Sequence, residues 1–264
     1  MIVYDLYIRE GNREYHLGCL PRRAEVGSLF PTLESRPETP LIPREKWQPI
    51  DFRHLVPKIL DQDGTNACNA FAAVQALHVI RAEAGLPFVE LSPGNLYGQI
   101  NGGADRGSLL GDAVRALADS GVCKADTVSP LQWRRSRWPN NWRDEAKRFR
   151  ILEAYDCPSF DHIASAIQYG FPVDFGVFVG GRFRPHPETG WLPEYLGGGG
   201  GHAMCGVGLA YHEGHKTWGI IAANSWGEQW GQKGFCIVPE SYFRRNAFAD
   251  AWAVRGVVDP TGPE

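Results

Sequence analysis

A cysteine stands where a polar, glycine-containing turn runs into an apolar helix. Residues 61–67 form the turn, and Phe71 begins a series of apolar residues at three-residue steps that predicts a helix starting near Cys68. Asn66 can serve as the N-cap, which places Cys68 in the first helical turn. Free backbone N–H groups and the helix dipole favour a thiolate there, so Cys68 is a candidate nucleophile.

Two further residues could act with this cysteine, because a nucleophile needs a base to take its proton and a group that orients the base. His202 follows a run of glycines, residues 197–201, and leads into apolar residues that predict a strand. Asn224 directly follows the apolar strand predicted over residues 218–223. Each residue alone fits an inert core or loop position, but together they fit an acyl-transfer site.

With Gln62 placed before Cys68, the order Gln, Cys, His, Asn resembles that of the papain-like cysteine peptidases, in the branch found in bacteria. The resemblance covers residues 43–245. Its most specific parts are residues 62–71, 201–203 and 224–231. It implies hydrolysis of peptide bonds in a peptide or protein substrate through a covalent thioester, without a cofactor.

The resemblance also implies a role for each residue of the site. The Cys68 thiolate attacks the scissile carbonyl while paired with the imidazolium of His202, which then protonates the leaving amine and later activates water. Asn224 fixes the imidazole, and Trp226 covers their hydrogen bond from water. The Cys68 backbone N–H and the Gln62 side-chain amide hold the oxyanion.

A second set of residues is implied to bind the substrate. Gly107 and Ser108 form the edge that pairs with an extended peptide, and Leu109 and Leu110 lie in or near the main specificity pocket. Neither leucine nor Ala203 is charged, which predicts an apolar residue at the second position before the cleaved bond. The residues implied to contact substrate are Gly107, Ser108, Leu109, Leu110, Gly201, Ala203 and Trp226.

The chain departs from the family at two positions near the nucleophile. Asn69 stands where plant and animal members have tryptophan, which puts the leaving-group side of the cleft in doubt. Thr65 stands where secreted members have a disulfide cysteine, which favours a reducing compartment. The cysteines are widely spaced without a Cys-x-x-Cys pair, so neither a zinc cluster nor a stabilising disulfide is expected.

Helix patterns concentrate in the first half of the chain and strand patterns in the second, which predicts an α+β fold. The resemblance makes this fold papain-like, with the cleft between a helical half and an antiparallel β half. We expect an N-terminal extension over residues 1–42, with a hairpin and a proline-rich strap, a catalytic domain over 43–258 and a tail over 259–264. The extension lacks the length and periodicity of a helical pro-region, and it either packs on the body or masks the site.

Local patterns predict several element boundaries. Ser92 and Ser159 mark helix starts, Ser108 could cap a third helix, and alternation predicts a strand over residues 173–179. The glycine- and proline-rich loop over residues 180–201 is long enough to be a lid or a binding wall.

The net charge and the lack of long apolar runs argue against two kinds of partner, nucleic acid and membranes. The net charge of −3 and the pI near 6.2 argue against a general nucleic-acid binder. No apolar run reaches the roughly 20 residues that a membrane span needs, and residues 1–30 lack the apolar core of a signal peptide, so we expect a cytoplasmic protein without a membrane partner.

One segment, residues 131–150, is locally basic. Seven arginines and lysines against two acidic residues leave a surplus of +5, interleaved with Trp133, Trp138 and Trp142. The segment could dock an acidic partner or nucleic acid. Alternatively, the tryptophans pack a connection between the two halves while the arginines stay solvated.

Two other functions fit the same residues. A Cys-His-Asn acyltransferase or amidase would use a different acceptor with the same site. A catalytically silent binding protein could keep the fold, although it would have no need of Gln62, Cys68, His202 and Asn224 together.

Overall fold

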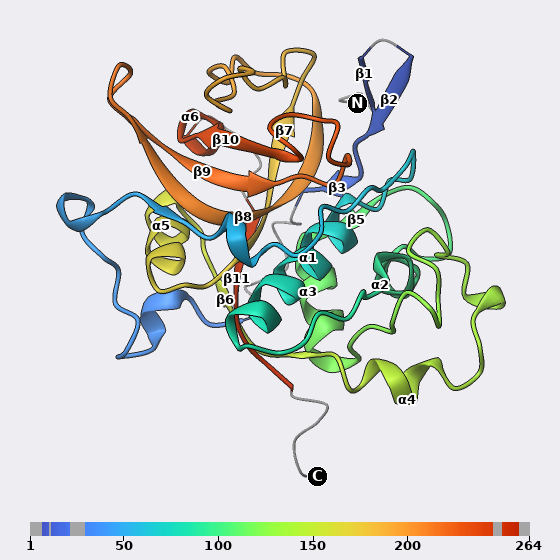
Figure 1. The fold of residues 1–264 in the computed structure, drawn as a ribbon. Coiled ribbons are helices and arrows are strands. Elements are labelled where there is room, and N and C mark those ends of the chain that lie inside the picture. The colour runs from blue at the N-terminus through green and yellow to red at the C-terminus, as the bar shows by residue number, and fades with distance from the viewer. Residues whose placement is uncertain (1–6, 11, 22–29, 245–249, 259–264) are drawn as a thin grey trace.

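The computed structural model describes residues 7–10, 12–21, 30–244 and 250–258. Helices gather on one side of the molecule and a large antiparallel sheet on the other, which confirms the predicted α+β, papain-like fold (Figure 1). Within the described ranges, no helix is both long and apolar enough to cross a bilayer.

The helical half is built around one buried helix. Helix α1 (Cys68–Glu83) packs against α2 (Pro93–Ile100) and α3 (Leu110–Asp119), while α4 (Trp142–Ala146) lies at the outer end of this half (Figure 1). We expected α1 to bury one face, but residues 68–81 are buried on all sides, because the sheet covers the face that the helices leave. Such a helix holds its first turn rigidly.

Helix starts follow the predicted caps in two of four cases. Ser92 accepts a hydrogen bond from the Asn95 backbone and precedes Pro93 at the first helical position, and Ser159 caps α5 (Phe160–Gln168) in the same way. Ser108 does not cap α3, whose N-cap is Leu109. The backbone of Ser108 is used instead in the short strand β5 (Ser108–Leu109).

The β half is one antiparallel sheet in the order β10-β9-β8-β7-β11-β6, with β4 (Ile50–Asp51) also paired to β8. The predicted strand over residues 173–179 is confirmed as β7. The strands are β6 (Ile151–Asp156), β7 (Val173–Val179), β8 (Gly200–His212), β9 (Thr217–Ala223), β10 (Phe235–Pro239) and β11 (Asp250–Val257).

The two faces of this sheet bury separate cores. One face packs on α1 and the other helices of the first half, and the second face packs on α5, with α6 (Ser241–Arg244) beside it. Alternation along β8 shows the division, because Ala203 and Cys205 point to the α1 side and Met204 to the α5 side. The β side of the cleft is therefore supported by packing on both faces of the sheet.

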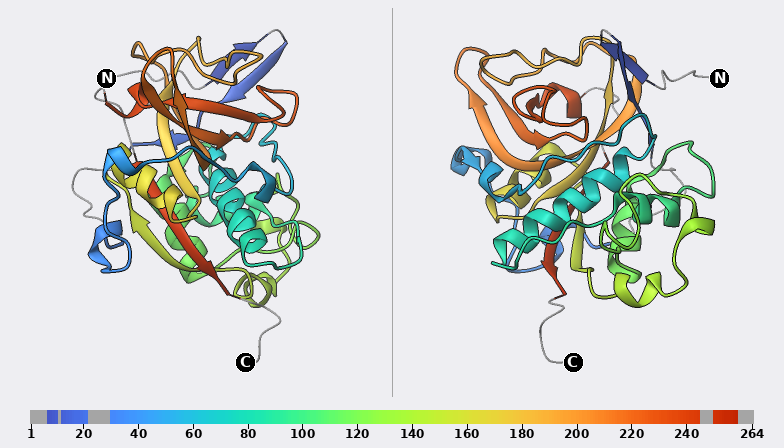
Figure 2. Two further views of the ribbon diagram at one scale, coloured as in Figure 1. Left: turned by 60° about the vertical axis from the view of Figure 1, so that its left-hand side comes forward. Right: turned by 45° about the vertical axis from the view of Figure 1, so that its right-hand side comes forward.

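The N-terminal extension begins with the predicted hairpin, β1 (Tyr7–Glu10) paired with β2 (Arg13–His16), which projects beyond the body (Figure 2). The chain then enters the body through β3 (Cys19–Leu20), which pairs with β5 in parallel. Residues 31–48 contain no α-helix, as their prolines predict, but include two 3₁₀ turns, η1 (Leu33–Ser35) and η2 (Arg44–Lys46). Two more 3₁₀ turns are η3 (Arg53–Leu55) and η4 (Arg135–Arg137).

The basic segment over residues 131–150 uses two of its tryptophans for packing. Trp138 and Trp142 meet edge to face at 5.0 Å and are buried in a small cluster with Cys123, Val128 and Ala146. The arginines stay at the surface, and those at 134 and 143 lie over neighbouring indole rings. This agrees with the packing alternative for the tryptophans.

Candidate active site

Cys68 is the first residue of α1 and is fully buried. The N-cap is Ala67, so the prediction of an Asn66 cap is wrong. Asn66 instead bonds Asp105: its backbone N–H donates to Asp105 Oδ1 at 2.9 Å, and its side-chain amide donates to the Asp105 carbonyl at 3.1 Å. The first-turn position of Cys68 is nevertheless as predicted, and the turn before it is tied to the helical half.

His202 lies on β8 with one ring nitrogen engaged and one unengaged. Its Nε2 is 2.7 Å from Asn224 Oδ1, and that oxygen also accepts the Ser225 backbone N–H at 2.8 Å. Because the amide oxygen can only accept, Nε2 carries the proton and Nδ1 of the neutral ring is basic. Nδ1 has no hydrogen-bond partner among the described residues. This is the tautomer that a general base for a neighbouring thiol requires.

Aromatic rings cover the His202–Asn224 hydrogen bond. The Trp226 ring lies 4.5 Å from the imidazole, centroid to centroid, and is itself buried. Phe183 packs edge-on against Trp226 at 5.6 Å, and Tyr15 stacks on its other side at 4.5 Å. Water is thereby kept from the pair, as the sequence predicted for Trp226.

Gln62 is buried with both ends of its amide in use. Its Oε1 accepts the Ser225 hydroxyl at 2.7 Å, and its Nε2 donates to the Thr65 carbonyl at 2.6 Å and to the His16 carbonyl at 3.1 Å. The first two contacts brace the turn before α1. The third shows that this amide can hold a peptide carbonyl inside the cleft, although here the carbonyl belongs to the protein's own N-terminal extension.

Residues 15–20, which we call the cleft segment, run between the two halves of the molecule. The Ser108 backbone N–H donates to the Gly18 carbonyl oxygen at 2.9 Å. At three glycines an added Cβ would strike backbone: at Gly18 it would lie 1.9 Å from the Asn66 oxygen, at Gly107 2.2 Å from the Gly18 oxygen, and at Gly201 2.0 Å from the Cys19 oxygen. The backbone of the cleft segment is therefore in contact with the backbone on both sides of the groove.

Burial sets the electrostatics of the covered site. It raises the pKa of the Cys68 thiol to about 11, although neighbouring backbone amides, among them that of Gly18, oppose the rise. It also lowers the pKa of His202 to about 4, although the bond to Asn224 acts in the other direction. The covered site thus favours the neutral thiol and neutral imidazole, because charged groups lose their hydration there. The predicted thiolate–imidazolium pair requires solvent or substrate to replace the cleft segment.

Comparison with known proteins shows the family. The family described as "Papain family cysteine protease" matches residues 47–247. The chain belongs to the papain family of cysteine proteases.

Individual relatives of this papain-family chain are distant. An uncharacterized peptidase C1-like protein of Acanthamoeba polyphaga mimivirus is 30% identical over 59% of this chain, and the germination-specific cysteine protease 1 of Arabidopsis thaliana is 27% identical over 73%. The match spans 54% and 52% of those proteins, so the chain covers about half the length of these curated relatives. Among solved structures, xylellain, a cysteine protease from Xylella fastidiosa, superposes with a TM-score of 0.72 at 21% identity, covering 97% of this chain and all of that one.

Three of the predicted substrate-binding residues border the cleft segment. Gly107 and Ser108 form one side of it and Gly201 the other. Ala203 packs in the core beside α1, Leu110 is buried at the start of α3, and Leu109 is half-buried. Gly107, Ser108 and Gly201 therefore lie at the groove, whereas Ala203 and Leu110 are core residues.

Three residues that hold the substrate edge were missed by the sequence analysis. The Asn69 amide donates to the Ser108 carbonyl and, at 3.1 Å, to its hydroxyl, so Asn69 lies on the Ser108 side of the cleft and not on the leaving-group side. The Tyr97 hydroxyl donates to Asp105 at 2.7 Å and accepts the Gly107 backbone N–H at 3.0 Å. A tyrosine and an aspartate this close in sequence carried no chemical motif that could have revealed the contact.

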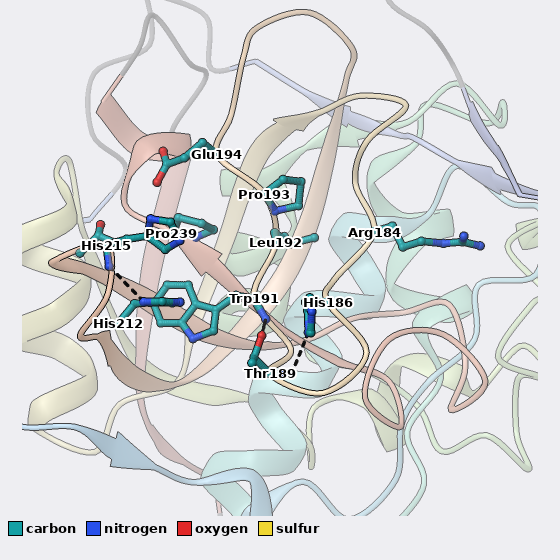
Figure 3. Close-up of a pocket in the computed structure, with 11 residues that line it drawn as sticks. Arg184, His186, Thr189, Trp191, Leu192, Pro193, Glu194, His212, His215 and Pro239 are labelled. Atoms are coloured by element: carbon teal, nitrogen blue, oxygen red, sulfur yellow. Dashed lines mark hydrogen bonds between the residues drawn. The ribbon is translucent and has the colours of Figure 1, made fainter.

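Two of the cavities that the described residues form lie away from Cys68 and His202. One, of about 540 Å³, is lined by Trp191, His186, His212 and His215 among others, and Figure 3 shows it at the outer side of the sheet. The other, of about 300 Å³, lies between the hairpin and Trp226. Across the described ranges, no group of three or more histidine, cysteine, aspartate or glutamate side chains is arranged to hold a metal ion.

Proposed function

We propose that this chain is a cysteine peptidase that hydrolyses peptide bonds through a thioester on Cys68. The observation that carries the proposal is the His202 tautomer: the bond from Nε2 to Asn224 leaves a basic Nδ1 in the same buried site as a helix-start cysteine. In this mechanism His202 takes the thiol proton, Cys68 attacks the carbonyl carbon, and His202 returns the proton to the leaving amine. Water activated by His202 then cleaves the thioester.

We also assign the oxyanion donors. The Cys68 backbone N–H lies in the first turn of α1, where it has no intrahelical acceptor, and the Gln62 amide already donates to the carbonyl of His16. Replacing the His16 carbonyl with the oxyanion of a substrate would keep the geometry of that hydrogen bond and add charge to it. The bond would then be stronger in the transition state than in the bound substrate.

We further propose that the cleft segment keeps the enzyme inactive until it is displaced. It presents the backbone amide of Gly18, not a carbonyl carbon, to the Cys68 sulfur. Tyr15 of the cleft segment lies against Trp226, and Cys19, further along the chain, pairs with Ser108. The family resemblance implies the opposite direction for a substrate, whose residues before the cleaved bond would lie at Ser108. A reversed peptide of this kind occupies the groove without being cut. One structural neighbour, the Amb a 11 cysteine protease, was solved in its proform, with a TM-score of 0.63 at 23% identity.

The experiment opens the cleft in the full chain. Gly18→Ala forces a Cβ against the Asn66 backbone, which is anchored to Asp105, so the segment must yield. Gly214→Ala is the matched control, because Gly214 is exposed at a turn and its Cβ would meet only the edge of the His212 ring, at 3.3 Å. We expect Gly18→Ala to hydrolyse a library of extended peptides, and a thiol-directed epoxide to label Cys68 and stop it.

The alternatives predict different results. If Cys68 of Gly18→Ala is labelled but no peptide is cleaved, the chain is a catalytically silent binding protein. If products form only with an added amine, it is an acyltransferase. If wild type and Gly18→Ala cleave peptides equally fast, the cleft segment does not inhibit.

The second proposed interaction, binding of an acidic partner by residues 131–150, is supported by fewer residues than the sequence indicated. Two of the tryptophans are buried, and Arg135 donates to the carbonyls of Gly98 and Gln99 at 2.7 and 2.8 Å. Exposed arginines, including Arg137 and Arg148, remain as a surface for an acidic protein. A titration with polyglutamate at low and high salt would test it, and absence of binding at low salt would reject it.

A further inference from the structure

A chain of hydrogen bonds joins the turn before the proposed nucleophile to the edge that is implied to bind substrate. Oδ1 of Asp105 accepts the Asn66 backbone N–H at 2.9 Å and the Tyr97 hydroxyl at 2.7 Å. The Asp105 carbonyl also accepts the Asn66 side-chain amide at 3.1 Å. The Tyr97 hydroxyl in turn accepts the Gly107 backbone N–H at 3.0 Å. One carboxyl oxygen therefore links the turn before α1 to the residue that precedes β5.

Tyr97 gives this chain of hydrogen bonds a rigid support. It lies on α2, which packs against α1 and β5 (Figure 1), and its side chain is fully buried in the core on the α1 side. Trp133 meets the ring edge to face at 6.3 Å. Burial and then the hydrogen bond to Asp105 raise the pKa of Tyr97, so the hydroxyl keeps its proton and donates to Asp105. A ring held in this way fixes the Asp105 carboxyl group, although Asp105 itself is only half-buried.

A second connection runs from the other side of the nucleophile. Asn69, which directly follows Cys68, donates its amide to the Ser108 carbonyl and, at 3.1 Å, to the Ser108 hydroxyl. All six cysteines are free, and Thr65 stands where secreted members of the family have a disulfide cysteine. Hydrogen bonds, and no disulfide, therefore set the distance between Cys68 and the Ser108 backbone N–H.

The separation of these two groups decides whether a bound peptide can react. The Ser108 N–H holds the Gly18 carbonyl of the cleft segment at 2.9 Å, and Gly107, with a φ of +81°, lies against the same oxygen. A substrate that replaces the segment would be held at Ser108 and attacked by Cys68, two residues that belong to different elements. A misplacement of about 1 Å can lower a reaction rate about a hundredfold.

We propose that Asp105 is a positioning residue that keeps a peptide bound at Ser108 in register with Cys68. This inference rests on the proposed peptidase function. Asp105 acts through Asn66 on one side and through Tyr97 on the other, and it is not itself a catalytic residue. It should therefore matter for ligands that extend to Ser108 and not for reagents that meet Cys68 alone.

The test compares a long and a short thiol reagent on the same variants. In the Gly18→Ala background, Cys68 is alkylated with iodoacetamide, which is too small to reach Ser108, and with an epoxide that carries a dipeptide. Both reagents need an open cleft, so the ratio of their second-order rate constants does not depend on the fraction of open molecules. Asp105→Ala should lower the epoxide-to-iodoacetamide ratio by at least about tenfold, and Tyr97→Phe should lower it in the same direction. Asp105→Asn keeps an oxygen that accepts both hydrogen bonds, so its ratio should stay within about threefold of the parent.

Tyr169→Phe is the matched control for Tyr97→Phe. The Tyr169 hydroxyl donates to the Pro40 carbonyl at 2.7 Å, in the proline-rich strap, and the ring packs on the core on the α5 side. Its loss should leave the ratio unchanged. Thermal melts show that each variant is folded, and a general loss of stability would change both rate constants alike. An unchanged ratio in both Asp105→Ala and Tyr97→Phe would overturn the proposal.

Hydrolysis keeps this proposal distinct from the proposed function. The ratio of kcat/KM for an extended peptide to that for a small activated ester should fall in Asp105→Ala as the alkylation ratio does. If no variant hydrolyses a peptide while the alkylation ratio falls, the peptidase function fails and Asp105 still positions peptides at Cys68. If peptides are hydrolysed and neither ratio changes, the peptidase function stands and the role of Asp105 is refuted.

Discussion

The proposed nucleophile and base, Cys68 and His202, are fixed by regular elements, whereas the cleft segment that covers them is held by hydrogen bonds and close backbone contacts. Cys68 starts a helix buried over residues 68–81, and His202 lies within a strand paired on both sides. The cleft segment, by contrast, pairs with a two-residue strand and follows a hairpin whose ion pairs are exposed. Covered and open states can therefore differ in the segment alone. Under the proposed inhibition by the cleft segment, the site would be assembled in advance and kept inactive by its cover.

The largest expected effect comes from the nucleophile. Cys68→Ala in the Gly18→Ala background should lower kcat by at least about a thousandfold, because no other group can form the thioester. Its melting temperature should stay close to that of the parent, since only one sulfur atom is lost. Rates of peptide hydrolysis and a thermal melt would measure both.

Cys236→Ala is the control for this variant. Cys236 is also buried, but it lies in the core on the α5 side, so its loss should leave hydrolysis intact. Hydrolysis that survives in Cys68→Ala, or is lost in Cys236→Ala, would contradict the assignment of Cys68.

Variants of Gln62 test whether one residue can both brace the fold and hold the oxyanion. Gln62→Ala should lower kcat by about 10²–10³ through the lost oxyanion donor. It should also lower the free energy of unfolding by about 1–3 kcal/mol, because the Thr65 carbonyl and the Ser225 hydroxyl lose their partner. Hydrolysis and melting of the same variant separate the two losses.

Gln62→Glu sharpens this test. It retains an acceptor for Ser225 but turns a carboxyl oxygen toward the carbonyls of Thr65 and His16 in a buried site, so kcat should fall as in Gln62→Ala and stability should fall at least as much. A normal kcat in either variant would remove Gln62 from the oxyanion site.

Local patterns in the sequence predicted the parts of the site that regular elements carry. The helix at Cys68, the strand before Asn224 and the caps at Ser92 and Ser159 each follow from periodicity or a capping residue. The predicted Asn66 cap failed because the helix begins one residue later, with Ala67 at the N-cap, and the Asn66 side chain is held by the carbonyl of Asp105, distant in sequence. A cap is a local preference that a tertiary contact can override.

The position of the cleft segment could not be predicted from sequence. Two-residue pairing between β3 and β5 leaves no periodic pattern, and Gly18, Gly107 and Gly201 look like ordinary turn residues until the backbones they touch are known. The sequence analysis therefore left open whether the extension packs on the body or masks the site. Asp174 was likewise part of an apolar strand, and only the register of β7 with β8 and β11 shows that it lies between Cys205 and Trp252.

Acid should loosen the cleft segment by a moderate amount. His202 has a pKa of about 4 in the covered site, below its ordinary value of 6.5. A lowered pKa stabilises the covered state fully above about pH 6.5, and this stabilisation is lost as the pH falls toward 4. We expect epoxide labelling of wild-type Cys68, relative to Gly18→Ala at each pH, to rise about tenfold from pH 7 to pH 5.

The ratio to Gly18→Ala removes the pH dependence of the labelling reaction itself. Far-UV circular dichroism must stay constant over the range, because His78, buried in α1 with a pKa of about 3, also lowers the stability of the whole fold in acid. If the labelling ratio does not change with pH while the circular dichroism spectrum stays constant, protonation of His202 is not coupled to the position of the cleft segment.

The smallest expected effect concerns the ion pair between Arg13 and Asp61, which joins the hairpin to the turn before α1 at 2.5 Å. Both side chains are more than one-third exposed, and exposed pairs contribute about 0–1 kcal/mol. Arg13→Ala should therefore raise the labelling rate of Cys68 by less than about fivefold at physiological salt, and by less still at high salt. Arg13→Lys keeps the charge and should behave as wild type.

Tyr15→Ala, which removes the ring stacked on Trp226, should open the cleft more than Arg13→Ala does, because it loses buried contact area and not an exposed charge pair. The reverse order would mean that charge, and not packing along the groove, holds the cleft segment in place.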